Sequence, residues 1–131
     1  MTQTRHTTSA DGTESLQFDN GQTEISYPDG TREVRFPDGT VKKIHASGNE
    51  DSIFPDGTVI HVEPNNGGRK VINFPNGQKE IHEKDRKSRS YPDGTVKTVF
   101  EDGTQETKYA SGRRRVKDKD GNVLVDTVEA R

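Results

Sequence analysis

Four histidines are the residues of this chain best suited to metal binding or to acid–base chemistry at neutral pH. They are His6, His45, His61 and His82. None follows the His-Glu-x-x-His spacing that turns two histidines toward one metal ion, and no serine nucleophile elbow accompanies them. The sequence therefore predicts no catalytic residue, no metal site and no cofactor, and an enzyme is the least favoured class.

The turn aspartates could suggest calcium, because nonapeptide repeats also build calcium-binding rolls. Those rolls need a Gly-Gly-x-Gly-x-Asp pattern. Here each repeat, such as the one containing Pro28-Asp29-Gly30, offers a single Asp and a single Gly. A hairpin turn uses both residues, so the pattern favours a turn over a calcium roll.

Aromatic side chains near a carboxylate are the combination here that could perform recognition. In the predicted register Phe18, Phe36 and Glu24 share one face of a sheet, together with Leu16 and Val34. Proline rings of an extended peptide pack on aromatic rings, and a carboxylate can receive an Arg or Lys of the peptide. We therefore predict a peptide-binding site at these five residues. A purely structural role for the rings, as cross-strand contacts, is compatible with it.

A nine-residue repeat must position these side chains. Its clearest copies are Tyr27-Pro28-Asp29-Gly30-Thr31 and Phe36-Pro37-Asp38-Gly39-Thr40. Proline presets φ, Asp suits the next position, and Gly takes the left-handed conformation, so each copy predicts a hairpin with a type I turn and a glycine bulge. The nine-residue spacing is kept by Gly12, Gly21, Gly30, Gly39, Gly48 and Gly57, and later by Gly94, Gly103, Gly112 and Gly121.

Between these turns we expect short consecutive strands, which can form only an antiparallel meander. No segment predicts a helix. The expected strands are 13–18, 22–27, 31–36, 40–45, 49–54, 58–63, 70–74, 78–83, 87–91, 95–100, 104–109, 113–118 and 122–127.

Composition excludes an ordinary two-layer core. Only 24% of the 131 residues are hydrophobic and 32% are charged. The sequence therefore predicts an all-β fold, a single-layer, free-standing antiparallel meander of about a dozen short strands with solvent on both faces. Residues 1–131 are expected to form one domain, and an N-terminally truncated array is an open alternative.

Charge and the exposed sheet edge suggest other partners. The net charge is -2, so nucleic acid and membrane are not expected partners, even though Arg113, Arg114, Arg115 and Lys117 form a basic run. The last strand would leave Val123, Leu124 and Val125 at an unpaired edge, which can template further strands. Self-association into extended assemblies through this edge is the alternative to peptide binding.

The chain resembles the C-terminal G-box (TCP) domains of the CPAP family of centriole-assembly proteins. The resemblance covers nearly the whole chain and is most specific in Ser52-Ile53-Phe54-Pro55-Asp56-Gly57-Thr58 and in Tyr91-Pro92-Asp93-Gly94-Thr95-Val96-Lys97-Thr98-Val99. It implies a free-standing sheet in the cytoplasm, at the centriole or centrosome, that binds a short proline-rich motif of a STIL-type partner. It also implies that Glu24, three residues before Tyr27, and Phe18 contact that peptide, with further contacting aromatics upstream of Met1.

Overall fold

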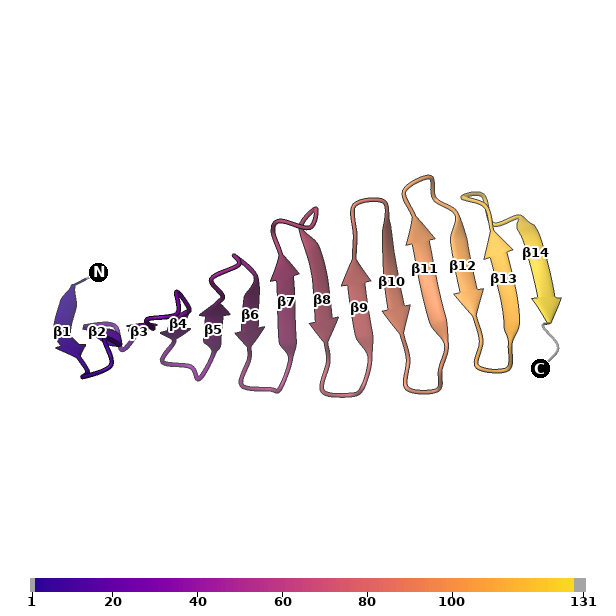
Figure 1. Ribbon diagram of the computed structural model, residues 1–131. Coiled ribbons are helices and arrows are strands. Elements are labelled where there is room, and N and C mark those ends of the chain that lie inside the picture. The colour runs from indigo at the N-terminus through magenta and orange to yellow at the C-terminus, as the bar shows by residue number, and fades with distance from the viewer. Residues whose placement is uncertain (1, 129–131) are drawn as a thin grey trace. The chain divides into compact units, whose positions relative to one another are not determined.

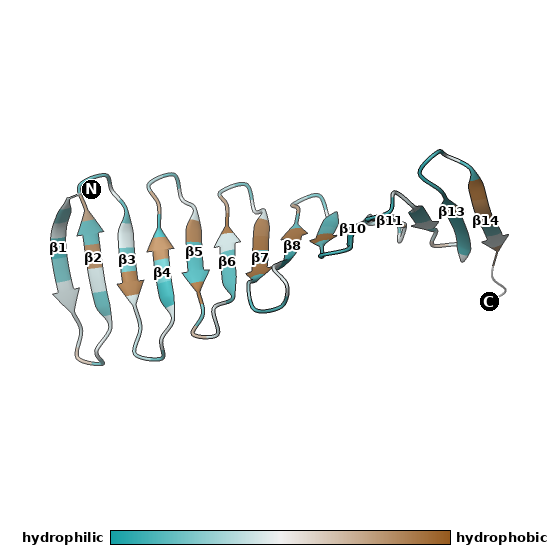
Figure 2. Cartoon of the chain, turned by 90° about the horizontal axis from the view of Figure 1, so that it is seen from above, coloured by the Kyte–Doolittle hydropathy of each residue, from teal (hydrophilic) through white to brown (hydrophobic). Residues whose placement is uncertain are grey.

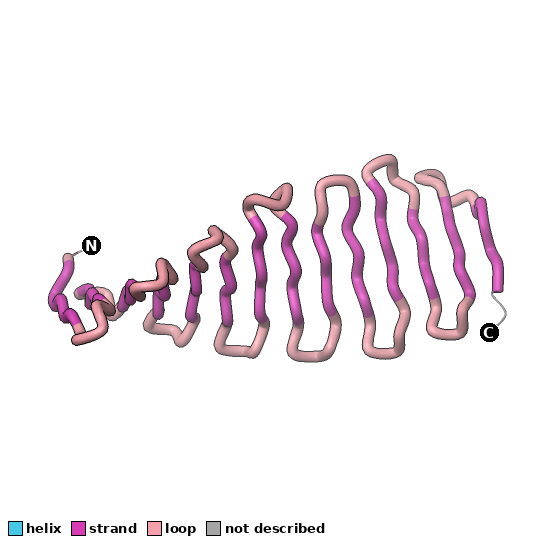
Figure 3. The backbone as a smooth tube through the Cα atoms, in the orientation of Figure 1, coloured by secondary structure: helices cyan, strands magenta, loops and turns pink. Residues whose placement is uncertain are grey.

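The computed structural model describes residues 2–128, which contain fourteen strands and no helix (Figures 1 and 3). They fall into two compact units, Met1–Asn66 and Gly67–Arg131. The described part of the chain holds no helix long and apolar enough to cross a membrane. One domain over residues 1–131 stays a prediction.

The first unit contains seven strands. They are β1 (Gln3–Thr8), β2 (Glu14–Phe18), β3 (Thr23–Ser26), β4 (Arg32–Arg35), β5 (Val41–Ile44), β6 (Glu50–Ile53) and β7 (Val59–Glu63). Each strand pairs antiparallel with the next.

The second unit contains seven strands as well. They are β8 (Arg69–Asn73), β9 (Lys79–His82), β10 (Arg86–Ser90), β11 (Val96–Phe100), β12 (Gln105–Lys108), β13 (Arg113–Lys117) and β14 (Val123–Val128). Successive strands again pair antiparallel. The prediction of an all-β antiparallel meander is confirmed in each unit.

Turn chemistry explains why the chain reverses where it does. In the turn after β3, the amide of Gly30 donates to the carbonyl of Tyr27 at 3.1 Å, and the amide of Tyr27 donates to the carbonyl of Thr31 at 2.8 Å. Gly30 has φ of 90°, in the left-handed region. The Asp29 carboxylate accepts from the Thr31 amide at 2.8 Å and fixes the turn from within. The predicted type I turn with a glycine bulge is confirmed.

Neither unit encloses an apolar core. Among residues 2–128 the buried hydrophobic side chains are Val34, Val71 and Val116, which are 7–8% exposed, and the buried charged residue is Glu33, at 7%. Hydrophobic and hydrophilic positions follow one another along strands such as β2, β4 and β5 (Figure 2). Stability must therefore come from backbone ladders, turns and cross-strand pairs, each contributing about 0.2 to 1 kcal/mol.

The first strand was not predicted, and the expected start of the sheet at residue 13 is wrong. β1 pairs with β2, from Thr8 opposite Glu14 to Gln3 opposite Phe18, with one irregularity between Gln3 and Arg5. Its sequence carries no large apolar residue and follows no glycine turn. The signal was the turn that ends at Gly12, because a hairpin turn needs a strand on each side.

Alternation sorts the strands β2–β7 into two faces. The face that we call the even face carries Leu16, Glu24, Val34, Lys42, Ser52 and Ile60 as one row of cross-strand partners. The opposite, odd face carries the row Ser15, Ile25, Glu33, Lys43, Asp51 and His61. The predicted assignment of Leu16, Glu24 and Val34 to one face is thus confirmed.

Candidate functional site

The even face brings the five predicted site residues together. Leu16 lies opposite Glu24, and Glu24 lies opposite Val34, on the neighbouring strands β2, β3 and β4. Phe18 ends β2 and its amide donates to the carbonyl of Gln22, while the amide of Phe36, after β4, donates to the carbonyl of Thr40, each at 2.9 Å. Both rings therefore lie on the even face, at the end of the strands where β2 and β4 enter their turns.

An open depression of about 560 Å³ lies between two of the aromatic side chains. Its lining consists of Phe36, Pro37, Asp38, Thr40, Lys42, Ser52 and Phe54. Phe36 is 37% exposed and Phe54 is half-buried, so the rings offer accessible surface. The depression includes Phe36 of the predicted site but not Phe18 or Glu24.

Six of the seven lining residues were not among the predicted site residues: Pro37, Asp38, Thr40, Lys42, Ser52 and Phe54. Phe54 had a readable signal, because it heads a Phe-Pro-Asp-Gly turn like that of Phe36. Its amide donates to the carbonyl of Thr58 at 2.9 Å, as the repeat requires. Lys42 follows from the register, since it lies opposite Val34 and Ser52.

Glu24 is the acidic group of the even face closest in register to the rings. Its side chain is 27% exposed, and Arg32 approaches its Oε2 at 4.0 Å. The side-chain amide of Gln22 donates to Oε1 at 3.1 Å. Arg32 itself is 54% exposed at its side chain. The carboxylate thus has one loosely placed cation and keeps acceptor capacity for an incoming Arg or Lys.

Leu16 and Val34 flank this carboxylate but offer different amounts of surface. Leu16 is half-buried, whereas Val34 is only 8% exposed. Val34 therefore supports its neighbours and presents little area to a ligand. Around the predicted site, the accessible apolar surface of the even face comes from Phe18, Phe36, Phe54 and Leu16.

The sequence profile of one family, described as T-complex protein 10 C-terminus, matches most of this chain. The matched stretches are residues 10–44, 28–50, 46–82 and 85–117. The chain belongs to this family.

Relatives of this T-complex protein 10 C-terminus domain include centrosomal proteins. The chain is 58% identical over 125 residues to Centrosomal P4.1-associated protein of Mus musculus, covering 95% of this chain and 9% of the mouse protein. This chain therefore spans about a tenth of the length of that relative.

Two solved structures of this fold carry bound peptides. The TCP10 domain of Danio rerio CPAP, in complex with a peptide of Danio rerio STIL, is 55% identical to this chain. The match has a TM-score of 0.89 and covers 95% of this chain and 67% of that one. The SAS-4 TCP domain of Drosophila melanogaster, in complex with a proline-rich motif of Ana2, is 21% identical with a TM-score of 0.84, over 97% of this chain and 90% of that one. At that identity the Drosophila match shows the fold alone.

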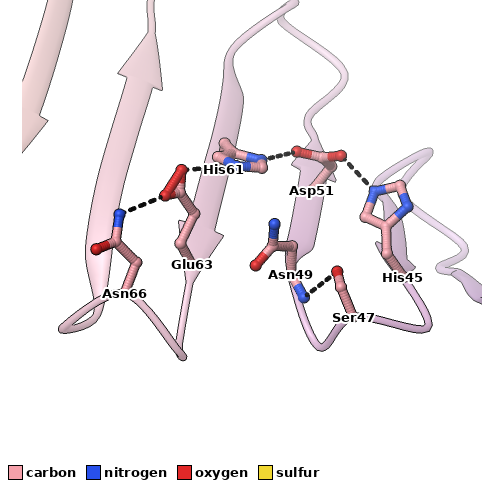
Figure 4. Close-up of polar contacts among 7 residues, drawn as sticks. All are labelled: His45, Ser47, Asn49, Asp51, His61, Glu63 and Asn66. Carbon is pink, nitrogen blue, oxygen red and sulfur yellow. Dashed lines mark hydrogen bonds and ion pairs between the residues drawn. The ribbon is translucent and has the colours of Figure 1, made fainter.

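A polar cluster lies on the odd face of this family member (Figure 4). One carboxylate oxygen of Asp51 accepts a hydrogen bond from Nε2 of His45 at 2.7 Å. The other accepts one from Nδ1 of His61 at 2.6 Å. Because a carboxylate only accepts, each of these ring nitrogens carries a proton. The second nitrogen of His61 lies 3.5 Å from Glu63. The cluster joins β6, β7 and the turn that follows β5 by side-chain contacts.

Electrostatics of the odd-face cluster favour an ionised Asp51. Burial acts to raise its pKa, but the hydrogen bonds from His45 and His61 outweigh burial and hold the pKa below its ordinary value. Within residues 2–128 no group of three or more His, Cys, Asp or Glu side chains is arranged to hold a metal ion. The arrangement can therefore stabilise the sheet, and it lies on the face away from Phe36 and Glu24.

The predicted self-association residues lie on β14. Val123 and Leu124 are 48% and 60% exposed, whereas Val125 is half-buried opposite Val116 of β13. The register shifts between Val116 and Lys117, which pair with Val125 and Val123, so Leu124 is the extra residue of a bulge and has no partner position on β13. Association through this edge stays a prediction.

Proposed function

We propose that this chain is a non-enzymatic scaffold module of centriole assembly, acting in the cytoplasm at the centriole or centrosome. In this proposal it binds a short proline-rich motif of a STIL-type partner on its even face. The observation that carries the proposal is the open depression between Phe36 and Phe54, on the same face as the partly exposed carboxylate of Glu24.

Proline chemistry fits this depression. A polyproline II peptide is extended, has no internal hydrogen bonds and presents its rings to aromatic grooves at a low entropic cost. Phe36, Pro37 and Phe54 supply the apolar walls, and Thr40 and Ser52 supply hydroxyls that can bond the peptide backbone. Support also comes from the zebrafish relative, which is 55% identical and carries a STIL peptide.

The sheet geometry sets the spacing of the peptide's contacts. Glu24 lies on β3, and Lys42 of the depression lies two strands away on β5. At roughly 4.8 Å per strand the two sites are about 10 Å apart. A polyproline II chain rises about 3.1 Å per residue, so a basic residue should stand about three residues from the proline that fills the depression.

The test is a calorimetric titration of the chain with a proline-rich peptide that carries one arginine three residues from a proline. Glu24→Lys and Phe36→Ala should each weaken binding by about tenfold or more, since each removes one anchor. Glu24→Gln keeps the shape and should show an intermediate loss. Tyr27→Phe, on the odd face, is the matched control and should bind as the wild type does.

Two results would reject the assignment. One is equal affinity of wild type and Glu24→Lys for the peptide, with both proteins folded by circular dichroism. The other is an affinity that does not change when the arginine is moved to one residue from the proline, because the sheet fixes the distance between Glu24 and the depression.

A further inference from the structure

The basic run of β13 is divided between two faces. Arg114 points to one face, where its Nε and Nη2 donate to Glu106 at 3.1 and 2.9 Å. Arg113, Arg115 and Lys117 alternate onto the other face. The run thus contains one neutralised arginine and three cations that share a side of the sheet.

Cross-strand pairing adds a fourth cation to that side. Lys97 of β11 lies opposite Thr107 of β12, and Thr107 lies opposite Arg115 of β13. Gln105, also on β12, lies opposite Lys117. A cavity of about 210 Å³ forms there, lined by Lys97, Gln105, Thr107, Tyr109, Arg115 and Lys117. Its lining has three cations, neutral hydrogen-bonding groups and no carboxylate.

The neighbouring carboxylate is engaged elsewhere. Asp126 of β14 accepts two hydrogen bonds from Arg113, at 2.9 Å from Nε and 2.8 Å from Nη2. Nε of Arg115 is 3.9 Å from the same carboxylate, beyond hydrogen-bond distance. Asp126 therefore engages Arg113 by two hydrogen bonds and Arg115 only by a long ion pair, which leaves the Nε of Arg115 without a hydrogen bond.

One buried donor of the cavity lacks a hydrogen-bond partner. Nε of Arg115 is buried and is the side-chain atom, among residues 2–128, that is buried without a hydrogen bond. A buried donor without an acceptor is unfavourable, so an acceptor placed in the cavity would relieve that penalty. Lys97 lies over the ring of Tyr91, with Nζ 5.6 Å from its centre, and in the described chain neither Lys97 nor Lys117 forms an ion pair.

We propose that this cavity binds the phosphate group of a phosphorylated peptide segment. A phosphate monoester carries a charge of about -1.5 to -2 at neutral pH and three acceptor oxygens. Arg115 can donate from its guanidinium edge, Lys97 and Lys117 supply two further positive charges, and Thr107 and Tyr109 supply hydroxyl donors. A single carboxylate would neutralise only one of the three cations.

A nucleic acid is a poorer fit than a phosphopeptide. Binding to a nucleic-acid backbone uses positive charges spread along a row of phosphates. Here three cations gather at one cavity, and the chain as a whole has a net charge of -2. The cavity lies in the second unit, so this inference does not depend on peptide binding by β2–β7.

The test follows the amide and side-chain NMR signals of this chain during titration with a phosphoserine peptide. Matched titrations use the same peptide without phosphate, the peptide with glutamate in place of phosphoserine, inorganic phosphate, and a short DNA duplex. We expect the phosphoserine peptide to shift the signals of Lys97, Thr107, Arg115 and Lys117 and to bind at least about tenfold more tightly than the unphosphorylated peptide. Inorganic phosphate should shift the same signals more weakly.

Variants separate the cavity from general charge. Arg115→Gln should weaken phosphopeptide binding by about tenfold, and Lys117→Gln and Lys97→Gln by several-fold each. Lys97 is exposed, so Lys97→Gln should leave the sheet folded. This variant still tests the proposal if Arg115→Gln unfolds the protein. Arg114→Gln removes the same charge from the opposite face and should leave affinity within about twofold.

Three outcomes would overturn the proposal. Equal affinity for the phosphorylated and the unphosphorylated peptide would show that the cavity does not recognise the phosphate. An equal loss in Arg114→Gln and Lys117→Gln would show a diffuse charge effect and no defined cavity. Binding of the DNA duplex more tightly than the phosphopeptide would assign the surface to a different class of partner.

Discussion

Nδ1 of His61 lies 2.6 Å from the carboxylate of Asp51, across β6 and β7 on the odd face. The same carboxylate also accepts a hydrogen bond from His45, which directly follows β5, so one acidic group links β6, β7 and the turn after β5. Asp51→Asn removes the negative charge to which both imidazole rings are hydrogen-bonded. We expect it to lower the free energy of unfolding by about 1 kcal/mol, because partly exposed ion pairs contribute about 0.2 to 1 kcal/mol each.

Urea unfolding at neutral pH checks this expectation. Because Asp51 lies on the face opposite to Glu24, the variant should keep its affinity for the proline-rich peptide. A weakened affinity in a folded Asp51→Asn protein would contradict the separation of the two faces.

Turn aspartates make the sheet sensitive to acid. A hydrogen bond from the backbone amide of Thr31 holds the pKa of Asp29 below its ordinary value of 3.8, and the amides of Thr40 and Thr58 act in the same way on Asp38 and Asp56. A depressed pKa in the folded state means that the stabilisation is present above pH 3.8 and is lost as the pH falls through the folded value. Stability should therefore fall steeply below about pH 4.

The lower end of this acid range is set by Asp11. Hydrogen bonds from the Ser9 side chain and the Thr13 amide lower its pKa to about 2. Asparagine offers the same acceptor without titrating: Asn20 and Asn76 already occupy equivalent turn positions and accept from the next-but-one amide at 2.9 Å. The triple variant Asp29→Asn, Asp38→Asn, Asp56→Asn should match the wild type at pH 7 and lose less stability at pH 3. Thermal unfolding across this pH range measures the difference, and identical acid profiles would contradict the mechanism.

Neighbouring turns contact each other through their glycines. Gly30 has φ of +90°, and a Cβ built there would lie 3.1 Å from the Cβ of Ala46, in the next turn along the same edge. Gly121 has nearly the same φ, +87°, with nothing within 4 Å. Left-handed strain costs about 1 to 2 kcal/mol at either position, so Gly30→Ala should be more destabilising than Gly121→Ala by the added crowding.

Chemical unfolding of both alanine variants measures that excess. Shortening the neighbour in the double variant Gly30→Ala, Ala46→Gly should recover part of the loss. Equal destabilisation of Gly30→Ala and Gly121→Ala would show that the turns do not support one another.

The edge strand β14 distinguishes the proposed function from its alternative. Leu124 is 60% exposed, and a lysine there would block strand addition by charge. Leu124→Lys should leave the affinity for the proline-rich peptide unchanged at every protein concentration. Light scattering on the same samples reports association. A loss of peptide binding that parallels a loss of association would favour edge-to-edge assembly over binding on the even face.

Much of the fold could be predicted from the sequence because the turn residues recur at fixed spacing. The three-residue loops fix which side chains share a face, so the placement of Phe18, Glu24 and Phe36 followed from counting. Strand β1 was not predicted because its sequence has no alternation of apolar and polar residues and follows no glycine turn. In this protein the local turn chemistry carries more information than hydrophobicity does.

The shape of each binding surface could not be predicted in the same way. The register already places Lys97, Thr107 and Arg115 in one row, but the depth of the cavity and the missing partner of Nε depend on side-chain rotamers. Likewise Asp126 could have paired with Arg113, Arg115 or both, and the structure shows the bidentate pair with Arg113. The sequence alone does not indicate which of several chemically equivalent partners forms the pair.

The most direct measurement for the proposed function is a set of intermolecular NOEs between the chain and the arginine-containing proline-rich peptide. We expect contacts from proline ring protons to the rings of Phe36 and Phe54, and from the arginine side chain to the residues beside Glu24. No contacts should reach His45 or His61 on the odd face. Proline contacts confined to the odd face or to β14, with none at Phe36, would contradict it.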